Sequence, residues 1–276
     1  MAISDLSGKI VFITGAASGI GAATALAFAK AGCEIVAADL SIASLQQTAA
    51  AVEKTGAAFH AIELDVTDEG AWSAIAANIA SGIGVPDILI NNAGVGAHGS
   101  FLNVPIKAVR KVMDVNLYGV IYGCHAFLPA MLAADGERHL VNIASLASVN
   151  PMPNMSAYAA SKYAVDGLTE VLAMELEDTN ISVTCVHPGV INTPIVEGDS
   201  HNGPAAADGL KRLGEYYREH GSDPAVVANG IVNAVRKDTA HLYVGAKAPF
   251  TAVLKRLSPG LTRRLSTRTA TQIGYA

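Results

Sequence analysis

Three side chains in the middle of the chain, Ser145, Tyr158 and Lys162, have types and spacing that suit acid–base chemistry. If Tyr158 and Lys162 lie on a helix, a separation of four places them on one face, with the ammonium group beside the phenol. A neighbouring positive charge favours the phenolate, so we expect the pKa of Tyr158 to fall from about 10 toward the working range, where tyrosine can act as a general base. The alternative is an ordinary pair on a helix surface. A second pair with this spacing, Tyr243 and Lys247, falls in a predicted strand and the loop after it. A separation of four does not bring the two side chains together there, because the segment is not helical.

A glycine-rich turn near the N-terminus could hold a phosphate group. The segment TGAASGIG at 14–21 follows a short apolar run and leads into an Ala-rich stretch, which predicts a strand-to-helix turn. Gly15, Gly19 and Gly21 would let the backbone approach a pyrophosphate, and the free amides at the helix N-terminus would face its negative charge. The spacing differs from the general Gly-x-Gly-x-x-Gly dinucleotide fingerprint, so an ordinary glycine-rich turn is the alternative.

Acidic and amide-bearing residues follow the next predicted strands. Asp39 comes 24 residues after Gly15, where a carboxylate can accept hydrogen bonds from an adenosine ribose and repel a 2′-phosphate. This favours NAD over NADP, and the alternative role for Asp39 is a helix N-cap. Asp65 and Val66 could likewise form a cap or a wall of an adenine pocket. The small, amide-rich run NNAG at 91–94 would let a ligand lie against the backbone.

The elements that position these residues follow from hydrophobic periodicity, because short Val/Ile-rich runs alternate with longer Ala-rich amphipathic stretches. This pattern predicts an α/β fold with a doubly wound, parallel, seven-stranded sheet in three α/β/α layers and a short basic C-terminal extension. Ligands of such sheets bind beyond the carboxyl ends of the strands. The alternation continues to about residue 245, which predicts a single dinucleotide-binding and catalytic domain at 1–245 and an extension at 246–276. Strands are predicted at 9–14, 34–38, 58–64, 87–91, 138–144, 181–187 and 241–245, and helices at 19–31, 41–55, 68–81, 105–133, 155–179 and 205–237, the last broken near Gly221.

Composition narrows the class of protein. The chain has 276 residues, of which 51% are hydrophobic and 16% charged, which excludes a disordered chain and predicts a large core. A net charge of −5 argues against nucleic-acid binding, which needs a basic surface. The three cysteines are too few and too scattered to predict a disulfide framework or a metal cluster, so no metal is expected. Neither a signal peptide nor an uninterrupted apolar run of roughly 18 residues is predicted, so we expect a soluble, cytoplasmic protein.

Taken together, these residues resemble the short-chain dehydrogenase/reductase family, in its compact single-domain NAD(P)-dependent branch. The matching motifs are TGAASGIG at 14–21, Asp39, Asp65–Val66, NNAG at 91–94, Asn116 in DVNLYG, Ser145 in NIAS, YAASK at 158–162 and PGVINT at 188–193. The resemblance implies a Rossmann-like fold and a NAD-dependent oxidoreductase that interconverts a secondary alcohol and its ketone by hydride transfer. The alternative is an NADPH-linked carbonyl reductase of the same family.

The resemblance also implies a role for each matching residue. Tyr158 would be the catalytic acid/base, Ser145 would hydrogen-bond the substrate oxygen, and Lys162 would lower the pKa of Tyr158 and hold the nicotinamide ribose. Asn116 would support a water-linked proton relay to Lys162. The cofactor would be bound by Gly15, Ser18, Gly19, Ile20, Gly21, Asp39, Leu40, Asp65, Val66, Asn92, Ala93, Gly94, Tyr158, Lys162, Pro188, Gly189, Ile191 and Thr193, the last four positioning the nicotinamide carboxamide.

The substrate is expected to be a small lipophilic alcohol or ketone. Loops at 95–101, 146–156 and 190–222 should line its site, and they carry many apolar side chains and no arginine or lysine before Lys211, which disfavours an anionic substrate. His98 is expected to be a solvated loop residue, with a place at the substrate mouth as the alternative. Apolar side chains in these loops could equally anchor the loops in the core. Substrate contacts are predicted for Ser145, Leu146, Met152, Met155 and Val190.

The C-terminal extension is basic and amphipathic. No acidic residue follows Asp238, so the first 238 residues carry a charge of −11 and the remainder +6. Apolar side chains can share one side of a helix, with Lys255 and Arg256 on another side, and Pro259 should divide the segment into two short helices. The apolar residues are Phe250, Val253, Leu254 and Leu257. We expect the extension to pack on its own subunit or on the partner of a homodimer or homotetramer. The alternatives are contact with an anionic membrane surface and a cover over the substrate cleft.

Overall fold

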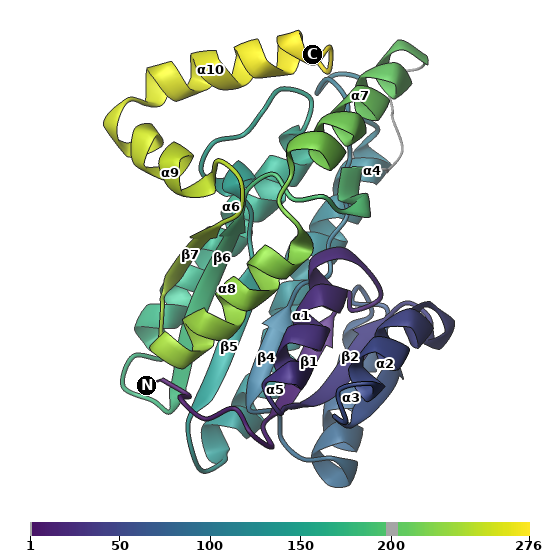
Figure 1. Ribbon diagram of the computed structural model, residues 1–276, viewed down its shortest axis with the longest axis vertical. Helices are drawn as coiled ribbons and strands as arrows, with labels where there is room; N and C mark the ends of the chain where they lie inside the picture. Colours follow the sequence, from purple (N-terminus) through teal and green to yellow (C-terminus); the bar gives the residue numbers. More distant parts are fainter. Residues whose placement is uncertain (1, 197–203) are drawn as a thin grey trace.

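The computed structural model describes residues 2–196 and 204–276, and its centre is a parallel sheet (Figure 1). The seven strands have the order β3-β2-β1-β4-β5-β6-β7, which reverses between β1 and β4. This is the doubly wound Rossmann-like topology that the sequence predicts, and the reversal marks the crevice where ligands bind. The strands are β1 (Ile10–Thr14), β2 (Glu34–Asp39), β3 (Phe59–Glu63), β4 (Ile88–Asn91), β5 (Arg138–Ile143), β6 (Ile181–Pro188) and β7 (His241–Val244).

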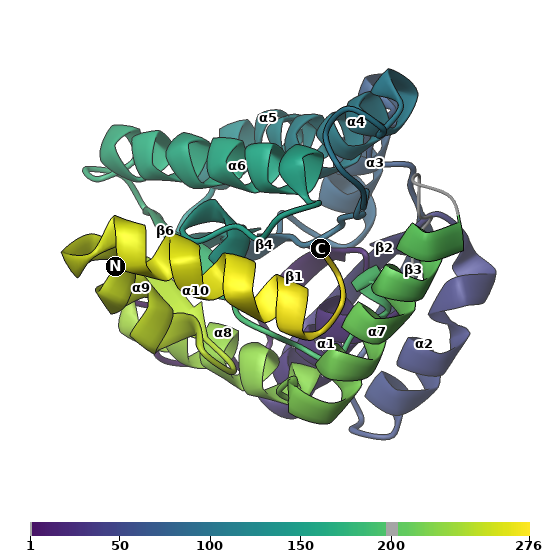
Figure 2. The same ribbon diagram turned by 90° about the horizontal axis from the view of Figure 1, so that it is seen from above.

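Helices cover both faces of the sheet, because alternate residues of each strand point to opposite sides (Figure 2). Val11 and Ile13 of β1 pack on the side of α1, α2 and α8, whereas Phe12 packs against Trp72 and Phe127 of α3 and α5. The helices are α1 (Gly19–Lys30), α2 (Gln46–Glu53), α3 (Glu69–Gly82), α4 (Ile106–Met113), α5 (Gly119–Ala133), α6 (Ser156–Glu175), α7 (Pro204–His220), α8 (Pro224–Lys237), α9 (Ala248–Leu257) and α10 (Pro259–Gln272). Short 3-10 turns are η1 (Ile42–Leu45), η3 (Leu146–Ser148) and η4 (Pro194–Val196).

The segment predicted as one helix at 105–133 contains an irregularity. Between α4 and α5 lies η2 (Asp114–Tyr118), a π-helical turn, and such turns often occur at functional sites. The combined run Ile106–Ala133 is long and apolar enough to cross a membrane, with a mean hydropathy of 1.3 in its most apolar window. Its side chains Phe127 and Met131 pack in the core beneath the sheet, which identifies it as a core helix.

Pro259 divides the extension as predicted, and it begins α10. The carboxyl ends of the parallel strands all lie at the end of the molecule drawn uppermost in Figure 1. Both α9 and α10 lie at this end, and Figure 2 shows α10 crossing it toward the C-terminal end of the chain. The extension therefore lies on the side where the predicted site residues gather.

Candidate active site

The glycine-rich turn connects β1 to α1. Gly15 has a φ of 64°, which glycine adopts without strain, and a Cβ there would lie 2.8 Å from the Cα of Ala93. A Cβ on Gly21 would overlap the carbonyl oxygen of Gly15, so the helix can begin this close to the turn only without a side chain. Ser18 is the N-cap of α1, but its side chain makes no capping hydrogen bond, and no acidic residue lies in the first turn of the helix, which includes Ile20. The amides of that turn keep their capacity to bind an anion.

Asp39 ends β2, beside this turn. Its Oδ2 accepts a hydrogen bond from the amide of Ala17 and its Oδ1 from that of Leu40, both at 2.9 Å. The alternative role as a helix cap is wrong, because Ser41 caps the next helix by accepting from the amide of Ala43. A carboxylate oxygen can accept more than one hydrogen bond, so Asp39 can bind the turn and still accept from a hydroxyl group.

Asp65 and Val66 follow β3. The Oδ1 of Asp65 accepts from the amide and the hydroxyl of Thr67, at 2.9 and 2.8 Å, whereas the cap of α3 is Asp68. Val66 is buried, and a Cβ on Gly119 would lie 3.0 Å from its side chain. The alternative of a plain helix cap is therefore wrong for Asp65, which forms a local turn beside the buried Val66.

The segment Asn92–Gly94 is tied to the glycine-rich turn by a residue whose contribution the sequence did not indicate. The hydroxyl of Thr14 accepts from the amides of Asn92 and Ala93, both at 3.0 Å. The Nδ2 of Asn92 donates to the carbonyls of Thr14 and Gly15, at 2.8 and 3.1 Å. These bonds hold together the loops after β1 and β4, the two strands between which the sheet order reverses.

Asn116 lies in the π-helical turn and is fully buried. Its Oδ1 accepts from the amide of Val95 at 2.8 Å, and its Nδ2 donates to the Val95 carbonyl and the Ser161 hydroxyl, both at 3.0 Å. A Cβ on Gly94 would lie 3.5 Å from the Asn116 Oδ1 and 3.6 Å from the Lys162 Nζ. Asn116 and Lys162 therefore both lie next to Gly94. This places them close to each other, as a proton relay between them requires.

Lys162 points from α6 to the end of β5. It is only 3% exposed, and its Nζ donates to the carbonyl of Ile143 at 2.7 Å. Burial disfavours the charged form and lowers the pKa of Lys162 to about 8, with Cys185 acting in the opposite direction. The Nζ lies 5.9 Å from the centre of the Tyr158 ring, so the two side chains share one face of α6, as their spacing predicts.

The predicted lowering of the Tyr158 pKa is wrong for the protein by itself. Burial raises this pKa, and a hydrogen bond with Ser145 acts in the opposite direction with a smaller effect. The ammonium group of Lys162 is bonded to the carbonyl of Ile143, and its charge does not overcome the burial of the phenol. The Tyr158 hydroxyl therefore keeps its proton at neutral pH and can donate it.

Ser145 stands at the start of η3, directly after β5. Its Oγ accepts from the amide of Ala147 at 3.1 Å. Its carbonyl accepts from the hydroxyl of Ser148 at 2.7 Å, and that hydroxyl also bonds the Nδ1 of His187 at 3.1 Å. Side chains from β6 thus support the turn that places Ser145 beside Tyr158.

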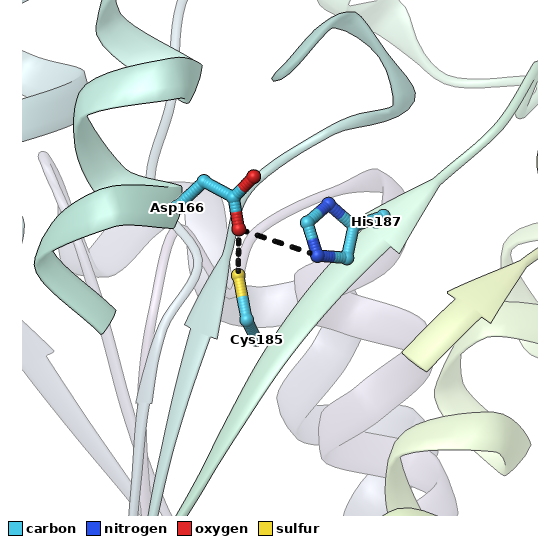
Figure 3. Close-up of side chains that lie close together, drawn as sticks. All are labelled: Asp166, Cys185 and His187. Atoms are coloured by element: carbon cyan, nitrogen blue, oxygen red, sulfur yellow. Dashed lines mark hydrogen bonds and ion pairs between the residues drawn. The ribbon is translucent and has the colours of Figure 1, made fainter. Parts of the chain in front are cut away.

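His187 belongs to a cluster with Asp166 and Cys185 (Figure 3). The Asp166 Oδ1 accepts from the Cys185 Sγ at 3.4 Å and lies 3.5 Å from the His187 Nε2. All three ligand-type atoms lie within 4.8 Å of one another, a proximity that cysteine spacing alone did not indicate. Burial raises the pKa of Cys185 far above its usual range, so the thiol keeps its proton and can donate it to Asp166. We interpret the cluster as a hydrogen-bond network beneath the Ser145 turn.

The segment PGVINT at 188–193 leads from β6 to the glycine-rich turn. A Cβ on Gly189 would overlap the carbonyl oxygen of Ala246, so this backbone passes directly against the loop after β7. A Cβ on Gly19 would lie 3.1 Å from the Thr193 Cγ2, so the segment ends at the start of α1. The predicted carboxamide-binding residues all lie on this path: Pro188, Gly189, Ile191 and Thr193.

Tyr158 packs against an apolar cluster, which includes two of the predicted substrate residues, Met152 and Met155. Leu146 and Val190 are not part of this cluster: Leu146 begins η3, and Val190 pairs with Ala246 in the loop after β7. Predicted substrate positions at 197–203 lie outside the described residues. The remaining members come from η3, η4, α7 and the C-terminal extension, whose packing here fits the alternative of a cover over the substrate cleft: Ala147, Ile195, Val196, Leu210, Leu213, Tyr217, Ala270, Ile273 and Tyr275.

Tyr275 binds the extension to the substrate loops. Its hydroxyl bonds the His98 Nδ1 at 2.8 Å and donates to the Asn154 carbonyl at 3.1 Å, and the Asn154 Nδ2 donates to the Tyr275 carbonyl at 2.9 Å. His98 is only 5% exposed, so the expectation of a solvated histidine is wrong. A partner 177 residues away gives no local sequence signal, which is why this contact could not be predicted.

The fold and site define a nucleotide-binding oxidoreductase: a glycine-rich turn at the switch point of a doubly wound sheet, with a serine, a tyrosine and a lysine at the end of β5 and on α6. The model of the short chain dehydrogenase family matches residues 9–203, and this protein belongs to that family.

Curated relatives share between a third and two fifths of their residues with this chain. The probable oxidoreductase EphD of Mycobacterium tuberculosis is 38% identical over 233 residues, or 83% of this chain and 39% of the relative, so the chain spans about two fifths of that relative's length. The trans-4-hydroxycyclohexanecarboxylate dehydrogenase of Sinomonas cyclohexanicum is 37% identical, covering 71% of this chain and 78% of the relative. The cyclohexanol dehydrogenase of an Acinetobacter species is 36% identical, covering 70% and 77%.

Solved structures match most of the chain. A short-chain dehydrogenase/reductase from Burkholderia phymatum in complex with NAD has a TM-score of 0.86 at 28% identity, covering 94% of this chain and 96% of that one. A short chain dehydrogenase from Mycobacterium paratuberculosis bound to NAD has a TM-score of 0.75 at 27% identity, covering 86% and 96%.

Proposed function

We propose that this protein is a NAD-dependent dehydrogenase that interconverts a lipophilic secondary alcohol and its ketone, with Tyr158 as the general acid and base. The observation that carries the proposal is the position of Tyr158. Its hydroxyl is hydrogen-bonded to Ser145, its ring lies 5.9 Å from the Lys162 Nζ, and it packs against an apolar cluster at the carboxyl end of the sheet. Acid–base groups beside an apolar pocket suit proton transfer to and from the oxygen of a greasy substrate.

The residues present fit NAD. A pyrophosphate would lie against Gly15, Gly19 and Gly21, where a side chain would fill the space, and would face the uncapped amides of α1. Asp39 would hold the adenosine ribose, and its negative charge disfavours a 2′-phosphate there. When bound, NAD supplies the nicotinamide that accepts or returns the hydride. Lys162, Asn116 and the segment 188–193 would hold its ribose, support proton relay and bind its carboxamide.

In alcohol oxidation, Tyr158 would have to act as the phenolate, which the positive charges of Lys162 and of bound NAD would favour. Its oxygen would then take the hydroxyl proton while the carbinol hydrogen leaves as hydride. Ser145 hydrogen-bonds the substrate oxygen while charge develops on it. In ketone reduction the same tyrosine gives its proton to that oxygen. Because burial raises its pKa, the proton is already in place at neutral pH, and the lysine ammonium becomes the partner of the phenolate once the proton has left.

The cluster beside Tyr158 favours a lipophilic substrate, because its members Met152, Met155 and Tyr217 are apolar or aromatic. Two relatives have names that denote alcohols on a cyclohexane ring, one of them also bearing a carboxylate. A ring-bearing secondary alcohol is therefore the substrate class that we propose. The enzyme would act in the cytoplasm as a homodimer or homotetramer, a state that light scattering can measure.

A parallel screen of cyclic secondary alcohols and ketones with NAD and NADP, following reduced nicotinamide, tests the proposal. Tyr158→Phe is the decisive variant, because it keeps the ring and removes the exchangeable proton. We expect turnover to fall by at least about a thousandfold, within the range that general acid–base groups contribute, while NAD binding by calorimetry is retained. Full activity in this variant would refute the assignment, and a preference for NADPH would favour the carbonyl-reductase alternative.

A further inference from the structure

Helices α9 and α10 present large apolar side chains to solvent. On α9, Phe250, Val253 and Leu257 are 72%, 58% and 78% exposed, and on α10, Leu261 and Leu265 are 45% and 44% exposed. Their spacings of three and four residues place them on one side of each helix. We call these five side chains, with the arginines beside them, the tail face. Adjacent apolar side chains of this size normally mark a surface that another molecule covers.

The opposite side of the same helices holds the extension on its own subunit. Ala248 and Ala252 of α9 and Thr262 and Ala270 of α10 are buried. The hydroxyl of Ser266 accepts a hydrogen bond from Asn150 of the substrate loop at 2.7 Å. Packing on the subunit therefore uses the small residues of the extension and leaves its large apolar residues outside. Fold stability alone does not explain those outer residues.

The tail face is also strongly basic. Arg263, Arg264 and Arg268 are exposed on α10, and among the described residues no carboxylate lies within ion-pair distance of them. Residues 246–276 contain six lysines and arginines and no acidic residue. On α10, Arg264 and Arg268 flank Leu261 and Leu265, and Arg263 is exposed on the other side of the helix. Two helices that expose Phe and Leu together with arginines are suited to the interface of an anionic bilayer. There the apolar groups enter, and the long arginine side chains reach phosphates.

We propose that the tail face binds the surface of an anionic lipid bilayer, so that α9 and α10 rest in the headgroup region and the acidic body stays in water. The charge distribution supports this occupant, because the chain before the extension carries −11 and the extension +6. An anionic membrane would attract the extension and repel the body, which fixes the orientation of the protein on the surface.

A second copy of the chain fits the tail face less well. A two-fold dimer places the same patch of both copies together. Here that patch would bring the basic tail faces of both copies together, and the extension offers no acidic residue to compensate Arg263, Arg264 and Arg268. Like charges in close contact are repulsive, whereas lipid phosphates compensate all of them.

The inner side of the extension faces the predicted substrate site. Ala270, Ile273 and Tyr275 belong to the apolar cluster around Tyr158, so the helix that would touch lipid also roofs the substrate site. A lipophilic alcohol dissolved in the bilayer would then reach the site beside the lipid surface. This consequence rests on the proposed function, whereas lipid binding itself does not.

Vesicle sedimentation of the full chain tests the proposal. We expect the wild-type protein to sediment with vesicles of phosphatidylcholine and phosphatidylglycerol, to stay in the supernatant with phosphatidylcholine alone, and to be released by high salt. Replacing Arg263, Arg264 and Arg268 by Gln should weaken binding about fivefold per arginine, or roughly a hundredfold together, at about 1 kcal/mol each. Phe250→Ser with Leu257→Ser should weaken it by more than about tenfold.

Matched control variants carry the same changes elsewhere. Lys30, Lys54 and Lys237 are exposed at the C-terminal ends of α1, α2 and α8, so replacing them by Gln removes the same charge from the body. Leu132→Ser with Met174→Ser removes two exposed apolar side chains from the ends of α5 and α6. We expect both controls to bind vesicles like the wild type. We also expect the tail variants to keep wild-type turnover on a soluble alcohol, which separates lipid binding from the proposed chemistry.

Wild-type protein left in the supernatant with anionic vesicles would overturn the proposal, and so would tail variants that bind as the wild type does. A loss of dimer mass in the tail variants without vesicle binding would assign the face to a second copy instead.

Discussion

Replacing Lys162 by methionine should change how the free energy of unfolding depends on pH, because the lysine is buried. The side chain is 3% exposed, and burial lowers its pKa from 10.5 to about 8. Below pH 8 the lysine is charged in both the folded and the unfolded chain, so the folded state bears the full cost of a buried charge. Between pH 8 and 10.5 it is neutral in the folded chain and charged in the unfolded one, so that cost declines as the pH rises.

The magnitude follows from the same shift. One pKa unit corresponds to about 1.4 kcal/mol, so the cost at pH 7 is about 3 kcal/mol and at pH 9.5 about 1.4 kcal/mol. Lys162→Met removes the cost at both values, and it also removes the hydrogen bond to the Ile143 carbonyl. The absolute difference in free energy of unfolding therefore mixes two effects. Its change between the two pH values isolates burial: the advantage of the variant should shrink by about 2 kcal/mol.

Denaturant unfolding of the wild type and Lys162→Met at pH 7 and 9.5, without cofactor, measures this change. Lys54→Met provides the control, because Lys54 is exposed and has no burial cost to lose. A difference between wild type and Lys162→Met that is the same at both pH values would refute the reasoning. Turnover of Lys162→Met should be abolished under all conditions, so the residue would be one that lowers stability and is retained for activity.

Two further substitutions test the contacts of Asp39 at the proposed cofactor site and of Tyr275 in the C-terminal extension. Asp39→Ala removes the bonds to the amides of Ala17 and Leu40, and we expect kcat/KM with NAD to fall roughly tenfold to a hundredfold while that with NADP falls less; an unchanged ratio would count against Asp39 as the discriminator. Tyr275→Phe removes the bonds of its hydroxyl to His98 and the Asn154 carbonyl, and we expect the free energy of unfolding to fall by about 1 to 2 kcal/mol. Equal denaturation midpoints for Tyr275→Phe and the wild type would show that these bonds do not stabilise the packing of the C-terminal extension.

The parts of this protein that could be predicted from sequence are those determined by local pattern. The strand and helix periods placed Gly15, Asp39 and Ser145 at the ends of three strands, and the parallel sheet then brought those ends to one side. The i, i+4 spacing placed Tyr158 and Lys162 on one face of α6. Local rules suffice here because strand direction and helical pitch are the same wherever these elements occur.

The features that sequence reasoning missed depend on distant packing. The Tyr158 pKa is raised by burial, and the cluster against which Tyr158 packs includes residues of α7 and α10, which are distant in the sequence. The π-helical turn that buries Asn116 has no spacing signal in DVNLYG. His98 is buried because Tyr275 reaches it, although a polar residue in a Gly-rich loop favours exposure when the loop is considered alone.

The extension and the acid–base chemistry are physically connected through this burial. Ala270, Ile273 and Tyr275 pack in the cluster that contains Tyr158, and removing water from a phenol raises its pKa. The same exclusion lowers the pKa of Lys162, so burial drives both side chains toward their neutral forms. The C-terminal residues therefore contribute both to the predicted substrate site and to the burial that keeps the proton on Tyr158 until a substrate oxygen can accept it. If the outer side of that roof binds lipid, as we propose, the membrane would act on the same helix that regulates the access of water to the catalytic hydroxyl.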